Sequence, residues 1–198
     1  MTEREFTVTW FNRNIPHLSQ VLEPLAGQPA LQMLEIGAYE GASTCWFLDN
    51  LLTGDGSHLT SLDTWEGSGE NDPTRMPEVW RRFQRNTAAY VTARRLTVVV
   101  GTSQRWLAAQ VAALRPGAPP FDMIHIDGSH AAADVLSDGV LSWALLRKQG
   151  VIIFDDYFWE GGRSEQERPR FAIDSFLACF LGQYDEVYRG HQVILRKR

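Results

Sequence analysis

The 198-residue sequence predicts an α/β fold, with helices on both faces of a doubly wound, mostly parallel β-sheet. Short apolar runs of strand length alternate with longer segments of helical periodicity, as in βαβ units. Several of the apolar runs end in a glycine-rich or acidic turn. Because ligands of open α/β sheets bind outside the carboxyl ends of the strands, these turns are the candidate site.

Five strands and five helices are expected to alternate after residue 30. The strands are expected at 31–36, 58–63, 95–100, 121–127 and 151–155. The helices are expected at 42–52, 77–90, 104–114, 131–147 and 169–181, with one more at 16–26. In 131–147 the apolar residues at helical spacing, which predict its buried face, are Val135, Val140, Leu141, Ala144 and Leu145. From residue 184 onward, two strands around a turn at 189–191 predict that the sheet closes with an antiparallel hairpin, its sixth and seventh strands.

Length and composition predict a single domain over 1–198, with an N-terminal helical or lid segment at 1–28. A hydrophobic content of 44% and a charged content of 22% are ordinary for a globular protein. The net charge of −5 argues against a nucleic-acid partner. The sequence has neither a signal-peptide pattern nor a membrane-length apolar stretch, and Cys45 and Cys179 suit a reducing compartment. We therefore expect a cytoplasmic protein without a membrane partner, and homo-oligomer formation stays open.

The first motif is the turn LEIGAYEG, residues 34–41. Gly37 can adopt backbone angles closed to other residues, and Gly41 lets the following helix approach a ligand closely. The spacing G-x-x-x-G differs from the dinucleotide fingerprint, and Glu35 would repel a pyrophosphate and attract an ammonium. The turn therefore favours a nucleoside-bearing ligand other than NAD; a glycine turn needed only for packing is the alternative.

Two further strand ends suit the remainder of such a ligand. Asp63 lies 22 positions after Gly41, close to the ~20-residue offset at which an acid meets ribose hydroxyls. The third strand ends in GTSQ, residues 101–104, whose short polar side chains could read an adenine edge. The alternatives are a turn acid at Asp63 and a helix N-cap at Ser103.

Three carboxylates end the fourth and fifth strands: Asp127, Asp155 and Asp156. Neighbouring strands lie about 5 Å apart, so these acids could share one ion, and clustered carboxylates repel unless a cation or proton intervenes. Oxygen ligands favour Mg²⁺, or Mn²⁺ or Ca²⁺, over zinc. Simple loop capping is the alternative.

His130 follows Asp127 by three residues, where the loop turns into a helix. A free imidazole has a pKa of about 6.5, which suits a general base near neutral pH. A structural histidine is the alternative, and it is our interpretation of His125 and the remaining histidines. The loops 66–77 and 158–169 lie on the same rim, and we interpret them as lids or substrate walls.

Together these motifs resemble class I S-adenosylmethionine (SAM)-dependent methyltransferases, and among them the small metal-dependent O-methyltransferases of catechol, natural-product and sugar type. The resemblance runs from Leu31 to the final hairpin and implies a Rossmann-like sheet of seven strands. It implies that SAM is held by Glu35, Gly37, Ala38, Tyr39, Gly41, Ser43, Asp63, Ser103, Gln104 and Asp127. It also implies that Mg²⁺ or a similar ion is held by Asp127, Asp155 and Asp156.

In this resemblance His130 stands at the base position, where the catechol enzymes have a lysine. The histidine is typical of the natural-product and sugar O-methyltransferases. The implied activity is transfer of the sulfonium methyl to a small-molecule hydroxyl, with Asp127 and His130 as catalytic residues. The alternatives are a metal-independent N- or C-methyltransferase and a non-catalytic SAM-binding module.

Overall fold

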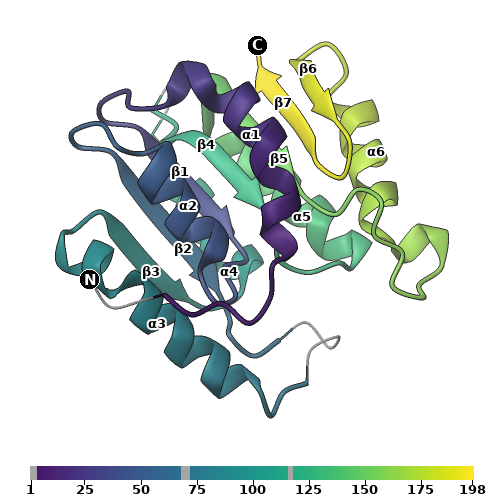
Figure 1. Ribbon diagram of the computed structural model, residues 1–198. Helices are drawn as coiled ribbons and strands as arrows, with labels where there is room; N and C mark the ends of the chain where they lie inside the picture. The colour runs from purple at the N-terminus through teal and green to yellow at the C-terminus, as the bar shows by residue number, and fades with distance from the viewer. Residues whose placement is uncertain (1–3, 68–71, 116–117) are drawn as a thin grey trace. The chain divides into compact units, whose positions relative to one another are not determined.

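The computed structural model describes residues 4–67, 72–115 and 118–198. Seven strands, mostly parallel and ending in an antiparallel hairpin, alternate with helices and confirm the predicted fold class (Figure 1). The chain divides into two compact units, Met1–Val100 and Gly101–Arg198. Whether they act as the single domain expected from the sequence stays a prediction.

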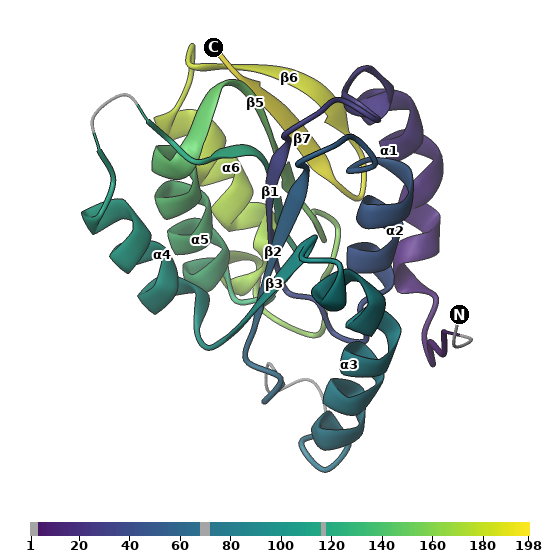
Figure 2. The same cartoon turned by 90° about the vertical axis from the view of Figure 1, so that its left-hand side faces the viewer.

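The first unit contains three parallel strands in the order β3-β2-β1. They are β1 (Gln32–Ile36), β2 (His58–Asp63) and β3 (Leu96–Val100). Its helices are α1 (Ile15–Leu22), α2 (Ala42–Asn50) and α3 (Met76–Thr92), and Figure 2 shows them on one face of these strands. A 3₁₀ turn (Glu23–Leu25) follows α1, so the helix predicted at 16–26 is confirmed in two pieces. The parallel register sets Glu35 beside Ser61.

The second unit combines one parallel strand pair with the hairpin. In it β4 (Phe121–Ile126) runs parallel to β5 (Leu146–Phe154), and β7 (Val193–Lys197) runs antiparallel to both β5 and β6 (Tyr184–Arg189). The helices α4 (Ser103–Ala112), α5 (Ala132–Leu145) and α6 (Pro169–Cys179) lie together on one face of these strands (Figure 2). β5 begins five residues earlier than predicted, directly after α5.

The buried face of α5 differs from the predicted one. Val135 and Leu145 are buried as expected, but Val140 is 45% exposed and Ala144 faces solvent. The buried face includes the polar residues Asp138 and Ser142 instead. The physical reason is Gly139: an added Cβ there would lie 2.8 Å from Phe154, so the helix makes its closest approach at this glycine.

The predicted loop at 66–77 lies partly outside the described residues, which omit 68–71. Within the described ranges, no helix is long and apolar enough to cross a membrane.

Replacing Gly139 by alanine should destabilise the protein, although a glycine-to-alanine change inside a helix ordinarily stabilises it by about 1 kcal/mol. The added methyl would meet the buried rings of Phe154 and Phe176, at 2.8 and 3.2 Å. Overpacking of this kind costs about 1–3 kcal/mol, so we expect the free energy of unfolding to fall by about 1–2 kcal/mol. Urea denaturation measures it, with Ser137→Ala on the same helix as the control. A Gly139→Ala protein more stable than its parent would contradict the packing described.

Candidate active site

The glycine turn between β1 and α2 has a left-handed backbone at three positions. Gly37, Tyr39 and Gly41 have φ angles of 87°, 48° and 85°. At Gly41 an added Cβ would also lie 3.1 Å from Phe83 and from Thr87 of α3. Gly41 is therefore required by its backbone angle and by the packing of α2 on α3, independently of any ligand.

Asp63 holds this turn in place. Its Oδ2 accepts hydrogen bonds from the amides of Ala38 and Tyr39, at 2.8 and 3.0 Å. Its Oδ1 accepts one from the amide of Trp65 at 2.8 Å. The carboxylate is only half-buried, so it links the ends of β1 and β2 while keeping a surface toward solvent.

Glu35 is completely buried, and hydroxyl groups enclose its carboxylate. Ser43 and Thr44 of α2 donate to its two oxygens at 2.6 Å each, and Ser61 of β2 donates at 2.7 Å. The acid therefore ties the first turn of α2 to both strands. From the sequence we expect Glu35 to attract an ammonium, whereas the contacts with Thr44 and Ser61 are not predicted by the motif.

The N-terminal segment reaches the same turn through Asn86 of α3. The Asn86 side chain accepts a hydrogen bond from the amide of Glu5 and donates to the carbonyls of Glu5 and Glu40, each at 2.9 Å. The Trp10 ring lies 5.3 Å from the ring of Tyr39. The predicted lid segment at 1–28 gives no indication of these contacts. They join residues up to 81 positions apart, and local sequence patterns do not reveal such pairs.

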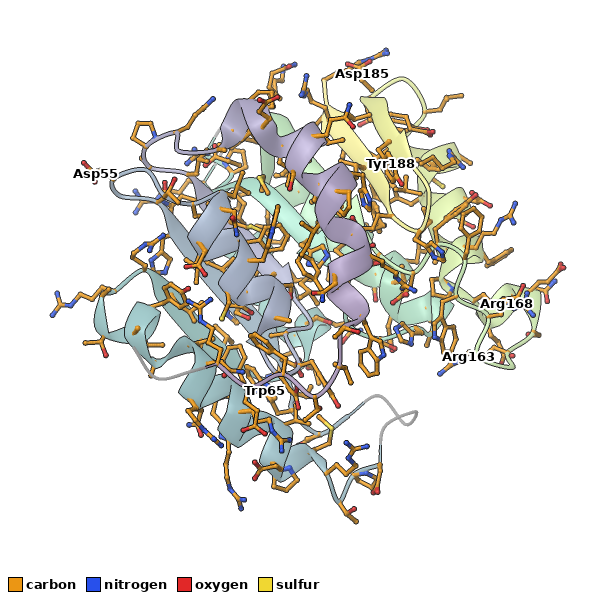
Figure 3. All side chains as sticks on the ribbon, viewed as in Figure 1. Asp55, Trp65, Arg163, Arg168, Asp185 and Tyr188 are labelled. Carbon is orange, nitrogen blue, oxygen red and sulfur yellow. The ribbon has the colours of Figure 1, made fainter. Side chains whose placement is uncertain are left out.

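A second aromatic group fixes the residues that follow β2. The Trp65 indole donates to the carbonyl of Tyr39 at 3.0 Å. Its ring centroid lies 4.3 Å from that of Trp80 and 4.6 Å from that of Phe83. Trp65 is labelled in Figure 3. Trp65 has a left-handed φ of 51°. Its ring contacts and the hydrogen bond from its backbone amide to Asp63 maintain that angle.

In the second unit the predicted acids and His130 come together at the ends of β4 and β5. Ligand atoms of Asp127, His130 and Asp156 lie within 4.8 Å of one another, and so do those of His125, Asp127 and Asp155. The two groups share Asp127. A small pocket here is lined by residues 126–130, Asp155 and Asp156, together with Val135 and Pro169.

Asp155 belongs to a buried network that includes Gln192 and His125, two residues outside the predicted site. Its Oδ1 accepts a hydrogen bond from the backbone amide of Asp156 at 2.7 Å. Its Oδ2 accepts one from the side-chain amide of Gln192, also at 2.7 Å. His125 Nε2 lies 3.6 Å from Oδ2, and both His125 and Gln192 are completely buried. Burial alone would raise the pKa of Asp155, but His125, Gln192 and the Asp156 amide hold it below its usual value.

His130 is positioned by two neighbours. Its Nε2 lies 2.8 Å from Oδ2 of Asp156, and its ring lies 4.4 Å from that of Trp159. Asp156 has a left-handed φ of 59°, which is rare outside glycine, asparagine and aspartate. The carbonyl of Asp156 accepts a hydrogen bond from the Trp159 amide at 2.9 Å. One tight turn therefore contains both residues that contact the His130 ring.

The predicted adenine-side residues begin α4. The N-cap of this helix is Thr102, so the alternative interpretation of Ser103 as N-cap is wrong. Two acids of α5 bind the first two residues of α4: Gln104 Nε2 donates to Asp134 at 3.1 Å, and the Ser103 side chain hydrogen-bonds Asp138. Asp138 is 2% exposed. Burial raises its pKa to about 7, the Ser103 bond opposes that shift, and the charge of Asp134 adds to it.

The sequence profile of a methyltransferase domain family matches residues 34–157. The chain belongs to this methyltransferase domain family. The matched range begins in β1 and ends just after the Asp155–Asp156 pair, so it contains the glycine turn, Asp63, the α4 start and His130. A comparison with curated protein sequences gives no match.

Solved O-methyltransferases share the fold. One is the Bacillus cereus O-methyltransferase in complex with S-adenosylhomocysteine (SAH), which is 20% identical to this chain with a TM-score of 0.64. The match covers 97% of this chain and 83% of that one. TomG of Streptomyces achromogenes, from tomaymycin synthesis and solved with SAM, is 19% identical with a TM-score of 0.64, covering 97% and 82%.

A third similar structure is MycE, the mycinamycin pathway methyltransferase solved with Mg, SAH and mycinamycin VI. It is 16% identical with a TM-score of 0.63, and the match covers 98% of this chain and 50% of MycE, so the chain spans half the length of MycE. At these identities the likeness shows the fold alone. It confirms the fold family that the sequence motifs resemble.

Asp63→Ala should weaken binding of SAH by about 1.5–3 kcal/mol, the range for a lost hydrogen bond to a charged group. It should also loosen the glycine turn, because three amides lose their acceptor together. Isothermal titration measures the affinity and urea denaturation the stability. Asp55→Ala, on the loop before β2 (Figure 3), is the control. Unchanged SAH affinity in a folded Asp63→Ala protein would remove this residue from the cofactor site.

Proposed function

We propose that the protein is a SAM-dependent O-methyltransferase that methylates a hydroxyl group of a small molecule. The observation that carries the proposal is the juxtaposition of His130 with Asp127 and Asp156, within 4.8 Å, in a chain of the methyltransferase family. A protein that only binds the cofactor has no need of an imidazole among carboxylates. A hydroxyl acceptor does need a base, since its proton must leave as the methyl arrives.

The cofactor would supply an electrophilic methyl group on a sulfonium. The residues around the glycine turn, Gly37 to Ser43, would hold its methionine end, Asp63 its ribose, and Ser103 with Gln104 its adenine. The turn fits this purpose because Asp63 already holds two of its amides, those of Ala38 and Tyr39. Glu35 holds the first turn of the following helix through the side chains of Ser43 and Thr44. A site whose backbone is set in advance loses less entropy on binding.

A divalent cation fits the acids of the second unit. Asp127, Asp155 and Asp156 would hold it, since carboxylate oxygens are the donors that Mg²⁺ prefers. Ligand atoms of Asp127 lie within 4.8 Å of those of Asp155 in one group and of Asp156 in the other. Carboxylates this close repel one another, and a cation removes that repulsion. When bound, such an ion supplies positive charge that favours the ionised form of an acceptor hydroxyl.

His130 would act as general base. As the acceptor oxygen attacks, the O–CH₃ bond forms, the S–CH₃ bond breaks, and the hydroxyl proton passes to the imidazole. Asp156, 2.8 Å from Nε2, would stabilise the positive charge that the ring gains. Trp159 would keep the ring from turning away.

A labelled-methyl transfer screen across diols, sugars and phenols tests the proposal, with Mg²⁺ and with a chelator. Transfer to oxygen that the chelator abolishes supports it. Transfer to nitrogen or carbon without metal would favour the metal-independent alternative. SAM binding with no transfer to any of these acceptors would favour the non-catalytic module.

His130→Ala should lower kcat by about 10²–10⁴-fold, the usual contribution of a general base. The affinity for SAH should change little, because His130 is not among the residues assigned to the cofactor. Steady-state kinetics and titration measure the two quantities, with His58→Ala on β2 as the matched control. Near-normal turnover by His130→Ala would return this residue to a structural role.

Asp155→Asn should reduce metal affinity by about 100-fold or more while keeping the shape of the side chain. The neutral amide removes a charged ligand, and one of its two polar atoms can no longer accept from Gln192 or Asp156. Titration with Mn²⁺ followed by electron paramagnetic resonance measures this without turnover. The control is Asp185→Asn on the outer strand β6 (Figure 3). Equal Mn²⁺ affinity in the parent and in a folded Asp155→Asn protein would dismiss the metal assignment.

A further inference from the structure

Two acids of α5 hold the two residues assigned to the adenine ring. Asp134 and Asp138 are four positions apart, so they lie on one side of the helix. Gln104 Nε2 donates to Oδ1 of Asp134 at 3.1 Å, and Ser103 hydrogen-bonds Asp138. Figure 2 shows α4 and α5 side by side over their length. Nothing in the motifs assigns a role to either acid.

The Asp134 contact fixes which way the Gln104 amide faces. An ionised carboxylate only accepts hydrogen bonds, so the NH₂ group of Gln104 must be the end turned toward Asp134. The carbonyl oxygen is then the end available to read a base. A carbonyl acceptor matches the 6-amino group of adenine and mismatches a 6-oxo purine, which presents an acceptor at the same position.

Burial shows that the arrangement is not a simple surface contact. Asp138 is 2% exposed, and its Oδ1 has no hydrogen-bond partner among the described residues. A buried acid with an unpaired oxygen destabilises a fold, and such groups in native proteins call for an explanation. Burial raises the pKa of Asp138 to about 7, and the charge of Asp134 adds to this shift. The position of Asp138 therefore disfavours its ionised form.

We propose that Asp134 and Asp138 are positioning residues that orient Gln104 and Ser103 to select a 6-amino purine in the cofactor. The proposal rests on the proposed function, in that it takes SAM as the ligand. It adds the origin of the base selectivity: Asp134 determines the polarity of the Gln104 amide, and Asp138 anchors the start of α4 beneath it.

Isothermal titration with SAH and with its deaminated analogue S-inosylhomocysteine tests this. The parent should bind SAH at least tenfold more tightly than the 6-oxo analogue. In Asp134→Asn the new amide can donate as well as accept, so the Gln104 amide is free to turn over. We expect SAH affinity to fall about tenfold and the preference for SAH to shrink by at least that factor. Ser137→Ala, which lies between the two acids and bonds only to carbonyls of its own helix, should leave both affinities unchanged.

The outcomes separate this inference from the function on which it rests. Asp134 is half-buried, so Asp134→Asn should fold even if Asp138→Asn does not. SAH binding by the parent together with an unchanged SAH preference in Asp134→Asn would overturn the positioning role and leave the proposed function standing. A parent that binds neither compound would overturn the proposed function, and this inference with it.

Discussion

The buried carboxylate of Glu35 is the interaction on which the first unit depends. A carboxyl group cannot be removed from water without hydrogen-bond partners, and here three hydroxyls from α2 and β2 provide them. Satisfying this one group therefore sets the position of α2 relative to both strands. Asp63 repeats the principle with three amides instead of hydroxyls. Glu35 of β1 and Asp63 of β2 thus hold the glycine turn at residues 37–41 and the start of the helix that follows it.

The acids of the second unit follow a different principle, because their nearest neighbours include one another. Asp155 accepts hydrogen bonds from Gln192 and from the Asp156 amide, and its carboxylate also lies within 4.8 Å of ligand atoms of Asp127 and His125. Asp127 and Asp156 lie within the same distance of a ring nitrogen of His130. Glu35 has three hydroxyl donors around it, whereas Asp127 lies close to other carboxylates, whose repulsion a cation can relieve. This difference separates Glu35, which holds the scaffold, from the proposed metal ligands.

The elements were largely predictable from the sequence because strand and helix periods are local properties. The predicted bounds of β2 match the structure to the residue, and β4 and β5 end one residue before the predicted ends at Asp127 and Asp155. The face of α5 was not predictable, since a helix that contacts its neighbours at Gly139 turns Val140 outward and Asp138 inward. The sequence did not predict roles for Gln192 and Asn86, and it predicted only a structural role for His125, for a related reason. Their roles depend on partners in distant segments of the chain. The spacing of residues within a motif does not predict such partners.

Three of the left-handed non-glycine residues lie beside the candidate chemistry, whereas Ala30, Arg94 and Gln149 adopt such angles elsewhere. Tyr39, Trp65 and Asp156 adopt left-handed backbone angles that cost about 1–3 kcal/mol each in ordinary residues. In every case the strained amide donates to a strand-end carboxylate: Tyr39 and Trp65 to Asp63, and Asp156 to Asp155. These carboxylates therefore do more than offer charge to a ligand. They maintain, before any ligand arrives, the backbone angles that aim the loop residues at it, which is why loops of this kind can be rigid enough for catalysis.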